Sequence, residues 1–444
     1  MEISLFIIII SMLIFYCMII NFDLLNPGVI FLGTWLLSTM INMFYSSKWG
    51  IKINSMTIWV VAIGTIAFCL GILMIAFLYE SKKNRCNISK SINIKKQELN
   101  IRRFKLYIIY MYIIISAIIM FQEVYKVSIL AGNTKGYAEM IKYARLGATH
   151  YNLGFGKLTA NLLRINYSLG IVIFYIFCNG VFEKKVSKER KELFIVSIIS
   201  LCLSSFSTGR TQFLGMISAY LMILLFEYAR CYAWKNNRYM KKVFKWIIIG
   251  CLIFVGMFTL SGIFTLDRMG NSTINDIIDN IALYIGSPIS CLSYFIENIS
   301  SYGQPMYFGE NTFISIYGTL KSLGVVEIIP DVFLPPVVTA NFRSNVYTLY
   351  YHYIYDFGIL GAIFIQLING IIYGWLYYRI KYSIVERVYT KLIYVILMYS
   401  LVMMFFQETL YSMLNTHIIR FIASIIIYKI LTSNINIIKN IKIV

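Results

Sequence analysis

Charged residues are scarce in this chain of 444 residues, of which 14% are charged and 59% are hydrophobic. A soluble domain of this length would carry about 25% charged residues. Apolar runs long enough to cross a bilayer, roughly 17 to 25 residues each, recur along the chain. We therefore expect an all-α integral membrane protein with about eleven transmembrane helices, over residues 3–20, 28–45, 57–79, 106–122, 161–182, 193–207, 211–228, 246–263, 357–378, 391–407 and 418–432.

The chain also lacks the short motifs of metal- and nucleotide-dependent enzymes. It has no Walker motif, no dinucleotide fingerprint, no metalloprotease helix and no Asp-x-Asp pair. Its eight cysteines are scattered, without the paired spacing of a zinc site. These absences disfavour metal-dependent or nucleotide-driven chemistry, so we expect neither a metal nor a cofactor.

Negative charge is half as abundant as positive charge, with 20 acidic and 40 basic residues. The basic residues cluster on alternate loops, at 80–105, 183–192, 229–245 and 379–391. Loops of this kind face the cytoplasm, which places the N-terminus outside. The clusters predict contact with anionic membrane lipid rather than with nucleic acid, in a multi-pass membrane protein.

Basic residues are almost missing from residues 264–355, which carry only Arg268, Lys321 and Arg343. We expect one polytopic membrane domain over 1–444, in which 264–355 forms a large extracytoplasmic loop. Isoleucines at helical spacing over 274–285 predict a short amphipathic helix at the membrane surface. Five of the six prolines, beginning with Pro288, are expected to break the rest of the loop into an irregular shell.

One candidate site is the turn Ser207-Thr-Gly-Arg-Thr211 between two apolar runs. A planar guanidinium matches phosphate oxygens in a bidentate way, so Arg210 is a candidate phosphate ligand. Arg145, Arg268 and Arg343 also fall on the expected outer face and could surround an anionic ligand. The alternative is that these arginines only reach toward lipid headgroups.

A second candidate site lies at the end of the large loop. His352 and Asp356 are four residues apart and would share one face of a helix entering the membrane. Either could act as a general base, and the alternative for His352 is an interfacial residue in an aromatic belt. The neighbouring tyrosines could stack on sugar rings. Glu310 is a secondary candidate for binding acceptor hydroxyls, with plain solvation as its alternative.

These motifs resemble those of a known family. The Ser-Thr-Gly-Arg turn, the long outer loop, and Asn345-Val-Tyr-Thr with Tyr355-Asp-Phe-Gly-Ile-Leu-Gly361 are similar to the oligosaccharide repeat-unit polymerases of the O-antigen polymerase type. The resemblance implies a metal-independent glycosyltransferase of a bacterial plasma membrane. It would polymerise undecaprenyl-pyrophosphate-linked repeat units into O-antigen, capsule or another exopolysaccharide at the outer face of that membrane.

The same resemblance implies site roles and partners. Arg210 would hold phosphate and His352 or Asp356 would activate the acceptor, with substrate contacts from Arg145, Arg268, Arg343, Glu310, Asn345 and Tyr347. A chain-length regulator and a flippase of the same pathway are the expected protein partners. Three alternatives stay open: a flippase for the same lipid-linked glycan, a glycan ligase with another acceptor, and a sensor or scaffold without catalysis.

Overall fold

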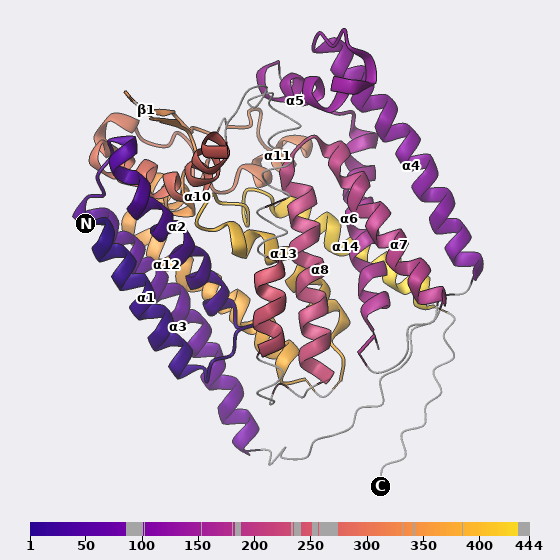
Figure 1. Ribbon diagram of the computed structural model, residues 1–444, viewed down its shortest axis with the longest axis horizontal. Helices are drawn as coiled ribbons and strands as arrows, with labels where there is room; N and C mark the ends of the chain where they lie inside the picture. Colours follow the sequence, from indigo (N-terminus) through magenta and orange to yellow (C-terminus); the bar gives the residue numbers. More distant parts are fainter. Residues whose placement is uncertain are drawn as a thin grey trace. The chain divides into compact units, whose positions relative to one another are not determined.

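The computed structural model is built almost entirely of helices (Figure 1). It forms two compact units, each assembled from distant parts of the chain: unit 1 is Met1–Ile92 with Gly270–His417, and unit 2 is Asn93–Met269 with Ile418–Val444. The structure describes residues 1–85, 101, 103–151, 153–179, 181–182, 188–231, 234, 241–250, 256, 274–330, 332–340, 342–383 and 385–433.

Unit 1 contains the N-terminal helices and the segment expected to form the large loop. Within its described residues it has α1 (Glu2–Ile19), α2 (Pro27–Trp49), α3 (Ser55–Arg85), α10 (Ile274–Glu297), η3 (Ile299–Tyr302), α11 (Ile314–Ser322), β1 (Val337–Thr339), β2 (Phe342–Ser344), α12 (Leu349–Lys381) and α13 (Val388–Met403).

Unit 2 holds the middle of the chain and most of the last helix. Its described residues form α4 (Arg103–Leu130), η1 (Gly136–Glu139), α5 (Met140–His150), α6 (Lys157–Cys178), α7 (Lys188–Leu203), η2 (Ser204–Ser207) and α8 (Arg210–Cys231). The last helix, α14 (Leu414–Thr432), begins with four residues that belong to unit 1.

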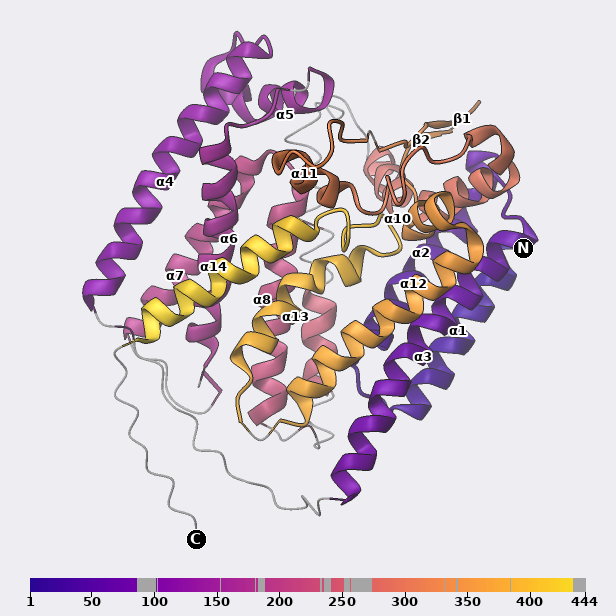
Figure 2. The same cartoon turned by 180° about the vertical axis from the view of Figure 1, so that it is seen from behind.

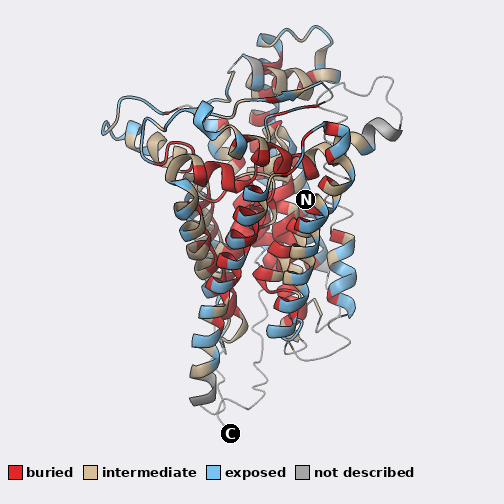
Figure 3. Ribbon diagram, turned by 90° about the vertical axis from the view of Figure 1, so that its left-hand side faces the viewer, coloured by how far each residue is buried: buried red, intermediate tan, exposed pale blue. Residues whose placement is uncertain are grey.

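Eight helices of the described chain are long and apolar enough to cross a membrane: α1, α2, the Ser55–Ser81 part of α3, α4, α6, α8, α12 and α14. Many of their outward residues are large and apolar, as on α1, where Ile7, Phe15 and Met18 are exposed. Figure 3 shows such helices with a buried side and an exposed side. The chain is therefore an α-helical multi-pass membrane protein.

The expected count of eleven spans is not confirmed. Two of the remaining runs fall on helices of 16 residues, α7 and α13. At 1.5 Å per residue such a helix is about 24 Å long, shorter than the roughly 30 Å hydrocarbon core. The run 246–263 lies mostly outside the described residues.

Helices α3 and α12 lie side by side in unit 1 (Figure 2). Two glycines one turn apart, Gly370 and Gly374, let the backbones approach closely. A Cβ atom on Gly370 would lie 2.0 Å from the Phe68 carbonyl oxygen, and one on Gly374 would lie 3.0 Å from Ile72 Cα. Small residues at this spacing are typical of helix contacts in membranes.

The proline prediction was wrong at Pro288, which lies inside α10 instead of ending it. Proline removes one backbone donor and distorts the preceding turn. Side chains of α2 satisfy carbonyls there: Ser38 Oγ donates to the Ile285 oxygen at 2.6 Å, and Asn42 Nδ2 donates to the Gly286 oxygen at 2.8 Å. The helix therefore continues to Glu297 against α2 and is longer than the expected surface helix.

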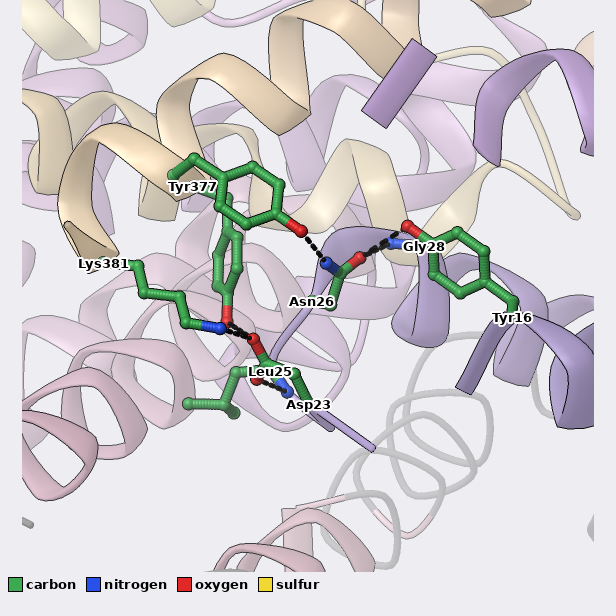
Figure 4. Close-up of polar contacts among 8 residues, drawn as sticks. Tyr16, Asp23, Leu25, Asn26, Gly28, Tyr377 and Lys381 are labelled. Atoms are coloured by element: carbon green, nitrogen blue, oxygen red, sulfur yellow. Dashed lines mark hydrogen bonds and ion pairs between the residues drawn. The ribbon is translucent and has the colours of Figure 1, made fainter. Parts of the chain in front are cut away.

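A polar cluster joins the α1–α2 loop to the last turns of α12 (Figure 4). Lys381 Nζ and the Tyr377 hydroxyl each approach Asp23 Oδ2 at 2.5 Å. Asn26 Nδ2 donates to the Tyr378 hydroxyl at 3.1 Å. The loop after α1 and the C-terminal end of α12 therefore lie at the same end of unit 1, as the predicted topology requires.

The C-terminal part of the predicted large loop adds a small sheet to the helices. Strands β1 and β2 pair antiparallel, with Val337 opposite Ser344 and Thr339 opposite Phe342. Val337 and Phe342 are buried, whereas Arg343 faces outward. The hairpin leads directly into α12, whose first turns carry the candidate residues of unit 1.

Candidate functional site

The first two turns of α12 are buried inside unit 1. From Leu349 to Ile354 every residue is buried, and exposed residues return at Gly358. At Gly358 the backbone leaves the helical region, with φ 69° and ψ −179°, which only glycine adopts readily. The break separates a short buried helix from the long membrane-spanning part.

Asp356 binds the backbone of the preceding loop. Its Oδ2 accepts the Thr312 N–H at 2.7 Å, and its Oδ1 accepts the Asn311 N–H at 3.3 Å. Asn311 in turn accepts the Phe333 N–H through Oδ1 at 2.9 Å. Two loop segments are thus fixed to α12 around this carboxylate, which gives Asp356 a clear structural role.

His352 reaches the same loop from one turn earlier. Its ring lies against the backbone of Asn311, and the side chain is only 5% exposed. Within the described residues its Nδ1 has no hydrogen-bond partner. His352 and Asp356 therefore do share a face of α12, as the spacing predicts, but that face is covered by protein. A base at His352 would need the loop over Asn311 to open or a substrate group to reach inward.

Glu310 is also used by the loop itself. Its Oε2 accepts the N–H groups of Met306 and Tyr307, each at 3.0 Å, and its Oε1 accepts the Tyr355 hydroxyl at 3.3 Å. The side chain is buried, so plain solvation is wrong as its interpretation. The carboxylate closes the turn before α11, and binding of acceptor hydroxyls remains a prediction.

Three tyrosines spaced four residues apart form a ladder, with Tyr347 just before α12 and Tyr351 and Tyr355 in its first turns. The rings of Tyr347 and Tyr351 stack with centroids 4.2 Å apart, and those of Tyr351 and Tyr355 with centroids 6.0 Å apart. The Tyr347 hydroxyl donates to the Pro335 oxygen at 2.7 Å, and the Tyr351 hydroxyl to the Phe333 oxygen at 2.6 Å. Tyr347 and Tyr351 are buried, so their rings cannot stack on a sugar in this structure. Their observed role is to anchor the loop.

Two further candidates of unit 1 face solvent. Arg343 is exposed on β2, and Asn345 is exposed just after it. Both could meet a soluble glycan without a change in the fold. Arg268 lies outside the described residues.

The turn before α8 organises the candidate site of unit 2. Phe206 in η2 packs against the α4–α5 cluster of Val124, Val127, Met140 and Ala144 and meets the Phe121 ring edge-on at 6.3 Å. This contact fixes the turn against α4 and α5, because an aromatic side chain buries a large apolar area. The turn then enters α8 at Arg210.

The same turn has a second predicted arginine, Arg145, beside it. A Cβ atom built on Gly209 would lie 3.7 Å from Arg145 Nη1, so the α5 guanidinium lies beside the residue that precedes Arg210. In the part of the chain that the structure describes, no carboxylate pairs with Arg145. Both arginines are half-buried. Two cationic side chains beside a helix N-terminus form a place suited to an anion such as phosphate.

Backbone strain marks this turn. Thr208 is buried and has φ 54°, a left-handed conformation that a β-branched residue rarely adopts. The turn is supported by a hydrogen bond from the Thr208 N–H to the Ser205 oxygen at 3.0 Å and from Ser207 Oγ to the Gly209 oxygen at 3.0 Å. Strain of this kind is often retained at functional sites.

Sequence reasoning missed the role of Glu408 in the α13–α14 connection. Its carboxylate accepts the N–H groups of Leu410, Tyr411 and Ser412, each at 2.8 Å. Burial raises the pKa of this carboxyl, and the three hydrogen bonds oppose the shift. The three N–H groups belong to the turn that precedes α14 at Leu414, so no helix-capping signal in the sequence marks this role.

The chain has two histidines besides His352. His417 is buried, and its Nε2 lies 3.0 Å from the Thr409 oxygen, whereas the side chain of His150 lies outside the described residues. Among the residues that were described, no group of His, Cys, Asp or Glu could hold a metal ion.

Comparison with known proteins adds one similarity. The chain is 25% identical over 218 residues to an O-antigen polymerase of Shigella dysenteriae. The match covers 48% of this chain and 51% of that protein, so the alignment spans about half the length of each. No protein-family model matches the chain, and no solved structure matches it.

Proposed function

We propose that this chain is a membrane glycosyltransferase that polymerises lipid-linked oligosaccharide repeat units into a surface polysaccharide. The observation that carries the proposal is Arg145 beside the Gly209–Arg210 turn, which provides a cationic place at the start of α8. The partial similarity to an O-antigen polymerase points to the same chemistry. Undecaprenyl pyrophosphate at the outer face of a bacterial plasma membrane is the proposed lipid carrier.

The proposed reaction needs few catalytic groups. The bond between the anomeric carbon and the pyrophosphate oxygen breaks, and an acceptor hydroxyl oxygen bonds to that carbon. Negative charge develops on the leaving pyrophosphate, where Arg145 and Arg210 would stabilise it. The acceptor proton would pass to a base, for which His352 is the proposed group and Asp356 the weaker one, because Asp356 already binds two backbone N–H groups.

Surface glycan from a strain lacking the gene tests the proposal. We expect its long-chain ladder to collapse to a single repeat unit and the wild-type gene to restore the ladder. Arg210→Ala and Arg145→Ala should each fail to restore it with the protein still present in the membrane, because loss of one charge-stabilising donor typically costs about 10²-fold or more in rate. Arg387→Ala is the matched control, since Arg387 is exposed after α12 and its side chain bonds only Ser383 among the described residues.

Two outcomes would contradict the proposal. If the single repeat unit is also missing from the surface of the deletion strain, the protein acts in export or ligation instead. If both arginine variants restore the full ladder, neither side chain stabilises the leaving group. His352→Ala tests the base separately, and wild-type chain lengths in that variant would exclude an essential base there.

A further inference from the structure

The segment between Pro305 and Pro330 exposes an unusual number of large apolar side chains for a part of the chain that does not cross the membrane. Met306 is 85% exposed, Phe308 78%, Leu323 70%, Val325 66% and Ile328 61%. Charge is sparse there: Lys321 and Glu327 are exposed, whereas Glu310 is buried and hydrogen-bonded within the loop. Exposed apolar surface of this kind needs a nonaqueous neighbour.

The level of this segment relative to the bilayer can be read from α12. From Gly358 to Lys381 the helix is about 36 Å long at 1.5 Å per residue, enough to cross a hydrocarbon core of roughly 30 Å. Leu360 and Phe364 are strongly exposed on this part, whereas the turns before Gly358 are covered by protein. The lipid-facing surface of α12 therefore begins close to Phe357 and Gly358.

Phe308 lies at that boundary. Its ring meets the Phe357 ring edge-on with centroids 5.1 Å apart, and the Phe313 ring also contacts Phe357, with centroids 5.9 Å apart. Gly309 makes this wrapping possible: it has φ 67°, and a Cβ there would lie 3.0 Å from Phe357 and 2.5 Å from Phe313. The apolar surface of the loop is thus continuous with the exposed strip of α12.

The position of α11 relative to the bilayer follows from its contacts with the start of α14. Asn415, in the first turn of α14, donates to the Ser315 oxygen and to Thr319 Oγ1. Ser315 Oγ donates to the Tyr411 oxygen at 2.8 Å. Helix α11 is therefore attached at the start of another candidate span, and its C-terminal end carries Leu323 and Val325.

From these contacts we infer that residues 306–329 form a lipid-contacting shelf. The shelf lies in the headgroup and upper acyl region of the leaflet that α12 enters, with Met306, Phe308, Leu323, Val325 and Ile328 facing lipid. Bulk lipid of that leaflet is the occupant, because Phe308 contacts Phe357 directly before the membrane-spanning part of α12 that exposes Leu360 and Phe364. Neither the proposed chemistry nor the identity of a substrate is needed for this inference.

Fluorescent probes test the shelf in nanodiscs. An environment-sensitive probe is attached to Phe308→Cys or Leu323→Cys in a chain whose native cysteines are replaced, with Leu360→Cys as the lipid control and Lys135→Cys as the aqueous control. We expect doxyl-labelled lipids to quench the probes at positions 308 and 323 as they quench the probe at 360. Aqueous iodide should quench only the Lys135→Cys probe strongly. Strong iodide quenching at 308 and 323, with no lipid quenching, would overturn the inference.

A photocrosslinking measurement keeps the test valid if the cysteine-free chain does not fold. A benzophenone amino acid replaces Phe308 or, as control, Lys135 in the otherwise native chain in membranes. We expect lipid adducts at position 308 and few at 135 when the protein is analysed by mass spectrometry. A crosslinked dimer or an adduct to another protein, in place of lipid adducts, would show a protein partner and would refute the lipid shelf.

Discussion

At the scale of single residues, two carboxylates that the sequence suggested as catalytic or binding groups accept backbone hydrogen bonds in the structure. Asp356 and Glu310 both accept N–H groups of the loop that precedes α11. A buried N–H group that loses its acceptor destabilises the fold by about 1–3 kcal/mol. Structural and catalytic roles of such a residue must therefore be separated by stability as well as activity.

Asp356→Ala should destabilise the loop over α12. The N–H groups of Asn311 and Thr312 would lose their acceptor, at a cost of about 1–3 kcal/mol. Asp356→Asn keeps one carbonyl oxygen for Thr312 and should be milder. Thermal unfolding in detergent and proteolysis of the loop measure the difference. Equal stability of Asp356→Ala and the wild type would contradict a structural role.

Glu408 gives a pH dependence with a definite sign. Because burial raises its pKa in the folded protein, the folded state holds this proton above the pH at which the unfolded chain releases it. This group's contribution to stability is therefore present at low pH and is lost as pH rises through the raised pKa. We expect the Tm of the wild type to fall with rising pH in the range just above the ordinary carboxyl pKa.

Glu408→Gln is the variant that isolates the effect. It cannot titrate, so this part of the pH dependence should disappear. It should also be less stable at all pH values, since the amide NH₂ cannot accept the N–H groups that the carboxylate accepts now. A variant with the wild-type pH profile would assign the dependence to another group.

At the scale of elements, the close contact of α3 with α12 depends on the absence of side chains at two positions of α12. Hydropathy alone predicted both helices, but it contains no information on which span pairs with which. The pairing follows from shape, because only glycine allows the Gly370 backbone to approach Phe68 this closely.

Gly370→Ala should therefore strongly destabilise unit 1. Its Cβ would meet backbone at 2.0 Å, and backbone cannot move aside as a flexible side chain can. Overpacking of this kind typically costs about 1–3 kcal/mol or more. Gly33→Ala in α2 is the matched control: no atom lies within 4 Å of its Cβ, so it should be neutral or stabilising. The Tm values of the two variants test this prediction, and equal values would refute the close contact of α3 with α12.

At the scale of the whole molecule, the membrane topology orders the loops on two sides. The Asp23–Lys381 ion pair, with a separation of 2.5 Å, places the α1–α2 loop and the end of α12 at one end of unit 1. The charge distribution predicts that this end is cytoplasmic. On that prediction the expected large loop would lie on the opposite side, where the proposed reaction would occur.

Reporter fusions test this topology directly. Alkaline phosphatase, which is active only outside the cytoplasm, should be active when fused after Asn345 and inactive when fused after Ser383. A reporter active only in the cytoplasm serves as the control and should give the reverse pattern. If both reporters give the opposite result, the orientation is inverted and the proposed outer-face reaction is excluded.

Hydropathy was enough to predict an α-helical membrane protein. A bilayer requires long apolar helices, and each of them is encoded by a continuous run of apolar residues. The sequence also located the α12 entry and the turn before α8, where charged residues interrupt apolar runs. The count of eleven spans stays a prediction, because α7 and α13 are shorter than the hydrocarbon core and hydropathy does not report where a helix ends.

The hydrogen-bond partners of the polar residues depend on the tertiary fold. In unit 2 the fold places Arg145 beside the turn before Arg210. In unit 1 it buries His352 and places Asp356 and Glu310 where they accept backbone N–H groups of the loop. It also keeps α10 helical through Pro288, with hydrogen bonds from α2. These contacts join residues far apart in the chain or depend on the exact course of a loop. No local pattern encodes them, because the free energy of a buried polar group depends on the donors and acceptors that the fold places around it.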